Sequence, residues 1–343
     1  MKQAHRFEHS KEIIGKNVEK KVDPKDRYRY VIIMKNKLIT ALDETSEPYI
    51  HHFQIWTGKK FRHVAEPFEP LKSALAEDNE RILALYESLI RQKGLQNIPQ
   101  AYRHNHGVHT NAVLHAKNRV WYRFDFKGFY DTVRFEDFAE YLKPIYPDIL
   151  SNAEQYKRCF IDPRTNGLIQ GSPTSGTLAG IALIKFWIEL KQLLPEATIT
   201  QYSDDLCISG VNLNQHNVQS IVKTCIKLAG LAVKLNTKKT RTDRYQYRCL
   251  TGVACNGDDT VTCYRKDYRA YRTLLHHMEL TDAASVLEQN DITAEKALGK
   301  LNYMLHIDQT GKVEKLMFQY SEPIQQLKNI IIEHQRARQG EAK

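Results

Sequence analysis

The sequence predicts an α+β protein whose central part is a split βαβ sheet covered by helices on one face. Two observations carry this prediction. From Arg119 onward, the order of expected elements is strand, helix, helix, hairpin, helix and a further hairpin. From Lys266 to the end, the pattern is mostly helical. Because one fold can host many activities, function has to be argued from particular side chains.

The first third of the chain shows a polar arm, a hairpin and a helix. Residues 1–27 are polar and lysine-rich, which is typical of a mobile arm or a short helix. Aromatic and β-branched residues at Tyr49–Trp56 and Phe61–Val64 flank a turn that contains Gly58, which predicts a β-hairpin. An apolar stripe from Leu71 to Ile90 predicts a helix that Gly94 ends.

The middle of the chain alternates strands and helices. Arg119–Phe126 reads as a strand that leads through a turn into a helix beginning near Phe135. A loop at 167–171 precedes a helix predicted at Ser172–Leu190, which has small residues on one side. Two β-rich runs within Ala197–Gly210 surround Ser203 and Asp204 and predict a second hairpin.

A helix and a last hairpin precede the helical end of the chain. Apolar residues on one face of Val218–Ala229, followed by Gly230, predict a helix with its end. The segments Leu250–Ala254 and Thr260–Tyr264 read as strands on either side of an Asn256-Gly257-Asp258-Asp259 turn. No internal repeat interrupts this order.

Composition favours a polyanionic partner. The 343 residues contain 50 Lys and Arg against 40 Asp and Glu, a formal net charge of +10 and a pI near 9.1. Nucleic acid is the commonest polyanion that proteins bind. The six cysteines form no CxxC pair, and the chain has no apolar stretch long enough to span a bilayer. We therefore expect reduced thiols and a soluble, cytoplasmic protein without a membrane partner.

Three aspartates stand out because each borders apolar strand residues. Asp125 lies within Val120–Phe126, and Asp204 and Asp205 lie at the turn of the second hairpin. Carboxylates at the ends of neighbouring strands ionise together only at a cost unless a cation joins them. Magnesium takes such oxygen ligands, and two ions would activate an attacking hydroxyl and stabilise a leaving pyrophosphate. Considered alone, the pair Asp204-Asp205 could simply be residues that favour a turn, and Asp125 could cap a helix.

These residues stand in segments that resemble the motifs of reverse transcriptases. Phe124–Tyr130 is similar to motif A, Leu168–Ser175 to motif B and Tyr202–Asp205 to the YxDD of motif C. Leu235–Thr240 is similar to motif D, and Lys60–Val64 with Pro67–Lys72 to the fingers motif. Four motifs in the family's order, within about residues 50–310, make the resemblance specific.

Within that family, the chain is most similar to bacterial retron-type enzymes. Asn111–His115 resembles their NAxxH element, Leu250–Gly252 their VTG triplet and Tyr264–Tyr268 the thumb segment that follows. The sequence departs from the family pattern at four places, without loss of a predicted metal ligand. Ser203 stands for the alanine of YADD, Ile169 for a proline, Gly176 for the proline after Ser175 and Leu250 for valine.

The resemblance implies a right-hand polymerase with fingers, palm and helical thumb. The expected domains are an N-terminal arm at 1–27, fingers at 28–118, a palm at 119–255 with a fingers insertion at about 134–168, and a thumb at 256–343. It also implies two Mg2+ ions as cofactors. The implied partners are dNTPs, a structured noncoding RNA template, the DNA product and, in a defence setting, a toxin or effector protein.

The resemblance assigns roles to the residues of the site. Asp125, Asp204 and Asp205 are expected to hold the metal ions, and Lys239 to protonate pyrophosphate as a general acid, a role that Lys238 fits almost as well. Tyr130 is expected to act as a steric gate against the ribose 2′-hydroxyl, although it could instead be a core aromatic. The residues expected to bind the nucleotide are Lys60, Arg62, Phe126, Tyr130, Gln170 and Gly171.

A second set is expected to contact RNA. Its members lie in the NAxxH element, the Leu-Thr-Gly triplet and the first thumb helix: Asn111, His115, Thr251, Gly252, Arg265 and Arg269. His115 could equally be a structural histidine beside a solvated loop. The thumb arginines, which include Arg272, alternate with tyrosines, a pattern that suits a phosphate backbone but also an ordinary solvated helix face.

The predicted function is RNA-directed DNA synthesis on a cognate structured RNA, in defence against phage. Three alternatives remain open: a catalytically silent RNA-binding scaffold, an RNA-dependent RNA polymerase and a group II intron-like reverse transcriptase. The intact carboxylates disfavour the first and Tyr130 the second. The third would need more chain than is present for its maturase and endonuclease regions.

Overall fold

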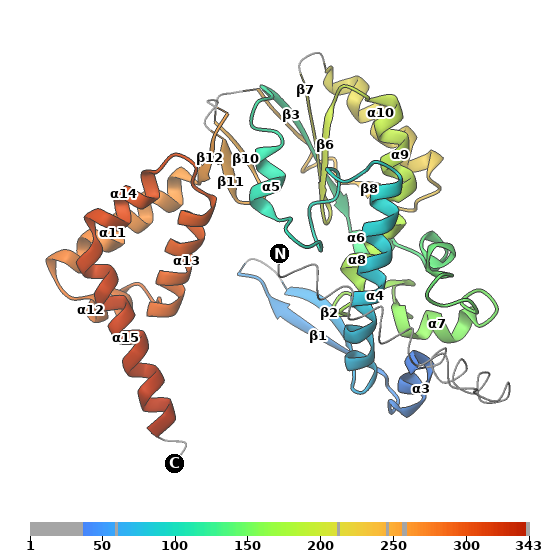
Figure 1. The fold of residues 1–343 in the computed structure, drawn as a ribbon, viewed down its shortest axis with the longest axis horizontal. Coiled ribbons are helices and arrows are strands. Elements are labelled where there is room, and N and C mark those ends of the chain that lie inside the picture. The colour runs from blue at the N-terminus through green and yellow to red at the C-terminus, as the bar shows by residue number, and fades with distance from the viewer. Residues whose placement is uncertain (1–36, 59–60, 211–212, 245–246, 256–258, 341–343) are drawn as a thin grey trace, which may run out of the picture. The chain divides into compact units, whose positions relative to one another are not determined.

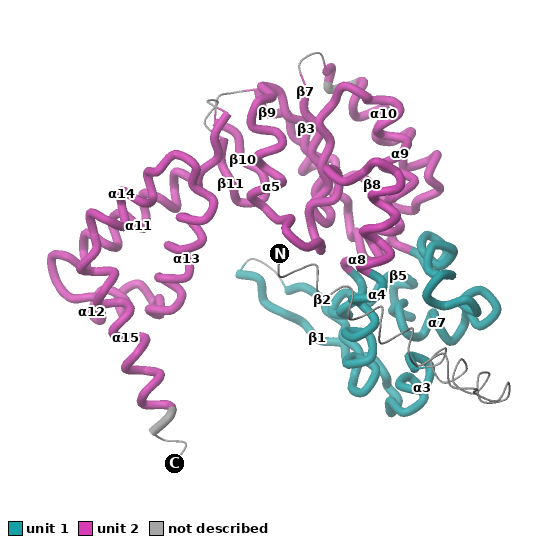
Figure 2. Tube along the Cα trace, in the orientation of Figure 1, with its two compact units in different colours: residues 1–82, 134–175 teal, residues 83–133, 176–343 magenta. Residues whose placement is uncertain are grey.

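The computed structural model describes residues 37–58, 61–210, 213–244, 247–255 and 259–340. The described chain forms two compact units, each made of two segments (Figure 2). Unit 1 contains Met1–Ile82 and Arg134–Ser175, and unit 2 contains Leu83–Val133 and Gly176–Lys343. The predicted arm at 1–27, Lys60 and positions 256–258 of the predicted turn lie outside the described residues. The boundaries of fingers, palm and thumb stay predictions.

Unit 1 combines a long hairpin with short helices (Figure 1). Its elements are α3 (Lys37–Glu44), β1 (Ile50–Trp56), β2 (Phe61–Pro67), the start of α4 (Leu71–Gln92), η1 (Phe135–Asp137), η2 (Ala139–Leu142), α7 (Ala153–Phe160), β4 (Ile161–Asp162) and β5 (Gly167–Leu168). The predicted hairpin is confirmed: β1 and β2 are antiparallel, with Ile50 opposite Pro67 and Trp56 opposite Phe61.

The predicted helix from Leu71 is also confirmed and ends as its sequence indicates. Gly94 has φ +67°, a left-handed conformation that glycine adopts without strain. The Gly94 amide donates to the Arg91 carbonyl at 3.1 Å, and the Leu95 amide to the Ile90 carbonyl at 2.9 Å. This pair of bonds is a Schellman motif, which satisfies carbonyls that the helix leaves without a partner.

The helix predicted near Phe135 is wrong in type. The chain forms two 3₁₀ turns there, η1 and η2. Phe135 and Phe138 pack against each other at 5.6 Å between ring centroids, and Phe138 packs edge-on against Phe160 at 6.0 Å. Side chains three residues apart align in a 3₁₀ turn, so burial of both rings favours it over an α-helix.

Unit 2 holds a mixed part and a helical end. Before the thumb, its elements are α5 (Val108–Val113), β3 (Val120–Lys127), α6 (Phe129–Thr132), α8 (Ser175–Ala182), α9 (Ile184–Leu193), β6 (Thr198–Tyr202), β7 (Asp205–Gly210), α10 (Gln215–Leu228), β8 (Lys234–Leu235), β9 (Arg241–Asp243), β10 (Arg248–Leu250), β11 (Val253–Cys255) and β12 (Val261–Cys263). The thumb helices are α11 (Arg265–Leu280), α12 (Ala283–Gln289), α13 (Ala294–Ile307), α14 (Lys312–Gln319) and α15 (Ser321–Gly340).

A five-stranded antiparallel sheet forms the centre of unit 2. Its order is β6-β7-β3-β8, and β9 also pairs with β3. The predicted strand and hairpin are therefore confirmed, and Figure 1 shows α9 and α10 beside the sheet. Phe126 of β3 meets Phe186 of α9 edge-on at 5.8 Å between ring centroids, so this helix seals an apolar face.

The single helix predicted at Ser172–Leu190 is interrupted. It consists of α8 and α9, and the Leu183 amide between them donates to the Gly180 carbonyl at 3.2 Å. Gly180 lies against Tyr86, whose hydroxyl would be 2.3 Å from an added Cβ. The sequence showed the small residues but gave no sign of the break.

The thumb has a core of its own, which joins helices α11 to α15 around residues such as Leu275, Met278 and Leu301. A second cluster joins β10, β11 and β12 to α5 and α13. The strand predicted at Leu250–Ala254 is wrong in its first part, because Thr251 and Gly252 turn the chain with φ +47° and +90° between β10 and β11. The hairpin predicted with Thr260–Tyr264 is confirmed, since β11 pairs antiparallel with β12.

Two further features concern the cysteines and the membrane-spanning potential of the helices. All six cysteines are free thiols, and five of them are buried. Among the described residues, none of the helices combines the length and apolar character that crossing a membrane requires.

Candidate active site

Strand pairing brings the predicted carboxylates to one edge of the sheet. In the antiparallel register of β3 and β7, Asp125 stands directly opposite Asp205. The Phe126 amide donates to the Asp204 carbonyl at 2.9 Å, which ties the hairpin turn to the end of β3. Ser203 occupies the turn with φ +54°. Asp125, Asp204 and Asp205 therefore lie together although 79 residues separate the first from the second.

Two side chains from the segment after β8 hold the Asp125 carboxylate. Asn236 Nδ2 donates to Oδ2 at 3.0 Å, and Lys239 Nζ donates to Oδ1 at 2.5 Å. The Asn236 backbone amide also donates to the Asp125 carbonyl at 2.7 Å. Asp125 is only 6% exposed, whereas the Lys239 side chain is 60% exposed. The lysine thus reaches from the surface onto a buried carboxylate.

The charges at this edge are coupled. Partial burial, together with the negative charges of Asp204 and Asp125, raises the pKa of Asp205 to about 6, against the opposing effect of Lys239 and Arg123. The hydrogen bond that Lys239 donates to Asp125 raises the pKa of Lys239, as do the negative charges of Asp125, Asp204 and Asp205. The site is therefore an acidic centre that attracts cations.

The donor set suits a hard divalent cation. Three carboxylates at one edge supply the oxygen ligands that Mg2+ prefers, and the raised pKa of Asp205 reports charge that a cation would relieve. Within the described ranges, however, no three His, Cys, Asp or Glu side chains are gathered closely enough to hold a metal ion as they stand. Asn236 and Lys239 instead donate hydrogen bonds to the two carboxylate oxygens of Asp125.

Tyr130 and Phe126 follow Asp125 but lie in different surroundings. Tyr130, in α6, is half-buried and its hydroxyl contacts those of Tyr102 and Ser203. Phe126 is 1% exposed and packs against Phe129 and Phe186. The Phe126 side chain thus belongs to the core, so a nucleotide contact by this residue stays a prediction that only its backbone could fulfil.

The remaining nucleotide-binding candidates that the structure describes belong to unit 1. Arg62 is exposed on β2, and Gln170 is exposed in the loop after β5. The Gly171 amide donates to the Ala65 carbonyl at 2.6 Å, and an added Cβ would lie 2.7 Å from that oxygen. The structure thus gives Gly171 a reason for being glycine that the sequence did not: close packing against β2.

The NAxxH element and the Leu-Thr-Gly triplet contact each other. Asn111 Nδ2 donates to Thr251 Oγ1 at 3.1 Å, and both residues are within unit 2. Asn111 is 1% exposed. Gly252 is the residue after Thr251 in the turn, and the Tyr303 hydroxyl would lie 3.3 Å from a Cβ added to it. The element predicted to contact RNA at this point is thus buried at Asn111 and anchors the β10–β11 turn.

His115 is a structural residue in this fold. It is fully buried, and its ring nitrogens lie 2.6 Å from Ser209 Oγ and 2.7 Å from Thr200 Oγ1. Burial lowers the pKa of His115 to about 3, so the ring is neutral at physiological pH. A direct contact with RNA is not open to this side chain, and the structural interpretation holds.

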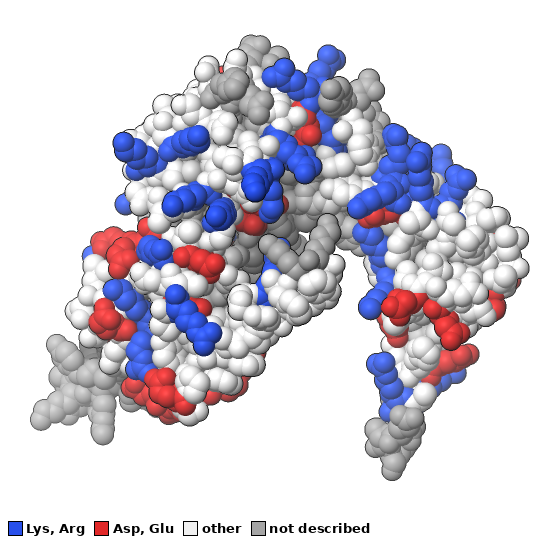
Figure 3. All heavy atoms as spheres, turned by 180° about the vertical axis from the view of Figure 1, so that it is seen from behind, with Lys and Arg blue, Asp and Glu red and all other residues white. Residues whose placement is uncertain are grey.

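The thumb arginines face solvent. Arg265, Arg269 and Arg272 are exposed on α11, while Tyr268 and Tyr271 pack against the thumb core. Figure 3 shows basic side chains gathered on part of the thumb surface. The arginines are thus free to meet phosphates, but those tyrosines are not free to stack on bases.

Two contributors to the site were not identified from the sequence. Asn236 lies in the segment similar to motif D, but its residue type alone gives no sign that it holds Asp125. Tyr102 lies in an irregular segment, with φ +57°, and no sequence pattern marks it. Only the folded chain brings these side chains to the carboxylates and to Tyr130.

Antiparallel strands that carry a carboxylate opposite an acidic hairpin turn, with a lysine from the next segment, define the palm of a nucleic-acid polymerase. The chain belongs to the reverse transcriptase (RNA-dependent DNA polymerase) family, whose model matches residues 20–251. This membership confirms the predicted α+β, right-hand polymerase class.

A curated relative agrees with the predicted resemblance to retron-type enzymes. The retron Ec73 reverse transcriptase of Escherichia coli is 29% identical over 175 residues, which are 45% of this chain and 54% of the relative. The match therefore spans about half of that protein.

Solved telomerase structures are similar at lower identity. Telomerase from Candida albicans, in complex with a fragment of telomeric RNA, gives a TM-score of 0.48 at 11% identity, covering 80% of this chain and 59% of that one. Apo telomerase from Candida tropicalis gives 0.47 at 11% identity, with the same coverage.

Proposed function

We propose that the chain is an RNA-directed DNA polymerase that extends DNA from dNTPs on an RNA template. The observation that carries this proposal is the register that sets Asp125 opposite Asp205, with Asp204 beside them and Lys239 on the Asp125 carboxylate. Family membership supports the same activity. A scaffold without catalysis would have no use for three coupled carboxylates at a strand edge.

In this proposal, Asp125, Asp204 and Asp205 would hold two Mg2+ ions, which would stabilise the charge on an attacking 3′-hydroxyl and on a leaving pyrophosphate. Asn236 orients Asp125 through its bond to Oδ2. Lys239 would be released from Asp125 once that carboxylate held a cation, and its ammonium would serve as a general acid toward pyrophosphate.

The expected nucleotide-binding residues are Arg62 and Gln170 of unit 1 and Tyr130 of unit 2. Arg62 would grip the triphosphate through its planar guanidinium, and Gln170 would contact the incoming nucleotide. Tyr130 would act as the steric gate that favours deoxyribose. Its half-buried ring follows Asp125 by five residues, and its hydroxyl lies 3.2 Å from that of Ser203 next to Asp204, which supports this role.

The test is a primer-extension assay with an RNA template and dNTPs. The Asp204→Asn, Asp205→Asn double variant is expected to lose at least about a hundredfold in rate, because charge stabilisation of a transition state supplies factors of that order. Asp291→Asn is the matched control: Asp291 is exposed in the thumb with φ +51°, which asparagine tolerates. Equal synthesis by wild type and double variant would leave the catalytically silent scaffold as the better reading.

We further propose that the template is a structured noncoding RNA and that the enzyme works in antiphage defence. The support is the similarity to a protein named as a retron reverse transcriptase. Sequencing of nucleic acid that copurifies with the wild type would reveal one dominant RNA and DNA complementary to it. The Asp204→Asn, Asp205→Asn variant would retain the RNA and lack the DNA. A mixture of unrelated RNAs would contradict a cognate template.

A further inference from the structure

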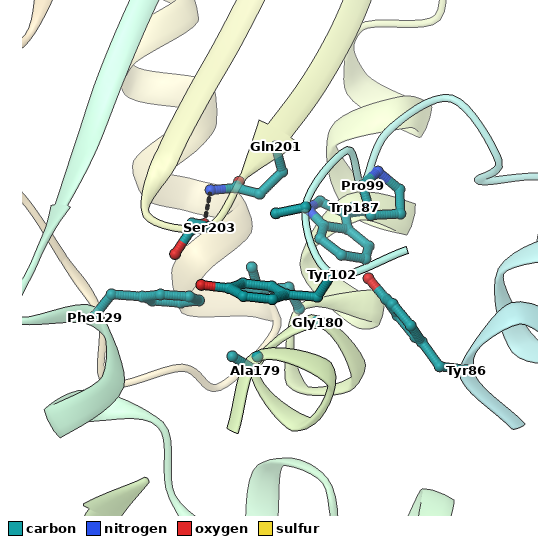
Figure 4. A pocket seen from close by; sticks show the side chains of 12 residues that line it. Tyr86, Pro99, Tyr102, Phe129, Ala179, Gly180, Trp187, Gln201 and Ser203 are labelled. Carbon is teal, nitrogen blue, oxygen red and sulfur yellow. Dashed lines mark hydrogen bonds between the residues drawn. The ribbon is translucent and has the colours of Figure 1, made fainter. Parts of the chain in front are cut away.

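Three hydroxyl groups meet beside the acidic hairpin turn. The Tyr130 and Tyr102 hydroxyl oxygens are 2.6 Å apart, and the Tyr130 and Ser203 oxygens are 3.2 Å apart. All three residues belong to unit 2. Tyr102 and Ser203 also line a small cavity of about 20 Å³, and Figure 4 shows the Tyr102 hydroxyl on the side of that cavity where Phe129 and Ser203 lie. The Tyr130 ring is thus held at its hydroxyl end by two different segments.

Tyr102 is held in place with some strain. Its φ of +57° is uncommon for a residue with a Cβ, and such conformations persist where surrounding structure enforces them. The ring lies directly on Gly176 of α8, where an added Cβ would come within 2.5 Å of two ring carbons. Only glycine at position 176 therefore leaves room for the ring in this position.

The backbone of Ser203 is also held in place by a hydrogen bond. The Gln201 side-chain amide donates to the Ser203 carbonyl at 2.8 Å, the hydrogen bond drawn in Figure 4. Ser203 and Gly176 are two of the positions at which the sequence departs from the reverse transcriptase motifs. An alanine at 203 would offer no hydroxyl to Tyr130, and a proline at 176 would displace Tyr102. Both departures therefore act on one cluster.

We propose that Tyr102 and Ser203 are positioning residues that fix the Tyr130 ring and thereby set the selectivity for dNTPs over rNTPs. The inference rests on the proposed function, in which Tyr130 faces the sugar of the incoming nucleotide. A steric gate discriminates between sugars by the position of its ring. Two hydrogen bonds that keep the Tyr130 ring from tilting therefore increase the discrimination between dNTPs and rNTPs. Burial raises the pKa of the Tyr130 hydroxyl, so it remains protonated and able to share both bonds.

The experiment measures kcat/KM for one dNTP and its matching rNTP on the same primer and template. Tyr102→Phe and Ser203→Ala are each expected to lower the dNTP/rNTP ratio about two- to tenfold, the range for loss of one hydrogen bond. Tyr320→Phe, in the thumb core, and Ser220→Ala, exposed on α10, are the matched controls and should keep the wild-type ratio. Partial unfolding of a variant lowers kcat/KM for both substrates by the same factor, so it does not change the dNTP/rNTP ratio.

Two further comparisons separate positioning from a general structural role. In a Tyr130→Phe background, which lacks the shared hydroxyl, Tyr102→Phe should change the ratio no further. Gly176→Ala should lower the ratio as Tyr102→Phe does, and it should have no added effect once Tyr102 is alanine.

An unchanged ratio in the Tyr102→Phe, Ser203→Ala double variant would overturn the inference, as would a Tyr102→Phe effect that persists without the Tyr130 hydroxyl. Failure of the wild type to incorporate dNTPs would instead refute the proposed function, and the inference with it.

Discussion

Lys239 Nζ lies 2.5 Å from Asp125 Oδ1, across 114 residues of sequence. A buried carboxylate at the strand edge is thereby neutralised by a lysine whose side chain is largely exposed. The same carboxylate is the ligand that a divalent cation would need. The ammonium group and a metal ion therefore compete for one oxygen atom, which makes the ion pair a measurable property of the metal-free protein.

Replacement of Lys239 by glutamine is expected to tighten binding of Mg2+ or Mn2+ about two- to fivefold, the effect of an exposed ion pair of about 1 kcal/mol or less. The cation then no longer has to displace an ammonium group. Titration calorimetry without nucleic acid measures the affinity. Lys238→Gln is the control, since Lys238 is exposed next to it. An equal increase in cation affinity in both variants would show that the lower net positive charge, and not loss of the Lys239–Asp125 ion pair, causes the effect.

Asp205→Asn is expected to stabilise the metal-free protein at neutral pH. The pKa of Asp205 is raised to about 6 from 3.8, so between about pH 4 and 6 the folded state binds more protons than the unfolded state. The unfolding free energy of the wild type therefore falls as pH rises through that window, and the loss persists above it.

Urea unfolding in EDTA from pH 4 to 7.5 measures this effect. The advantage of Asp205→Asn over the wild type should grow up to about pH 6 and then level off. Saturating Mg2+ should shrink it, because a bound cation stabilises the ionised carboxylate. An advantage that does not vary with pH would contradict the coupling, and Asp291→Asn should show no pH-dependent difference.

His115 is expected to make the fold sensitive to acid. Its pKa is about 3 in the folded protein and near 6.5 when solvated, so the unfolded state binds the extra proton between these values. The unfolding free energy should fall below pH 6.5 by up to about 1.4 kcal/mol per pH unit. His115→Gln should flatten that slope in urea unfolding, whereas His277→Gln, at an exposed position of α11, should not.

Gly171→Ala is expected to destabilise the protein by about 1–3 kcal/mol, because an added Cβ would lie 2.7 Å from the Ala65 carbonyl oxygen. Thermal and urea unfolding measure the change. Gly299→Ala is the matched control: nothing lies within 4 Å of its added Cβ in α13, so it should stabilise by about 0.5–1 kcal/mol. A neutral Gly171→Ala would show that the loop moves away from β2 without cost.

Local patterns were sufficient wherever a structure depends on neighbours in sequence. The alternating aromatic and β-branched residues of Ile50–Trp56 specify a strand, and the Leu71–Gln92 helix follows from its apolar stripe and Gly94. The patterns failed where distant packing decides the outcome. Thr251 and Gly252 look like strand residues, yet they form a turn that Asn111 holds from another element.

The sequence by itself determined the kind of chemistry: three aspartates in strand and turn contexts, a basic chain and ordered motifs. It also determined most elements, because side-chain periodicity and turn residues act over a few positions. Tertiary structure alone decided that Asp125 faces Asp205, that Lys239 reaches Asp125, that Phe126 and His115 are buried, and that Tyr102 holds Tyr130. These relationships depend on strand register and on contacts between segments far apart in the chain, which no local pattern encodes.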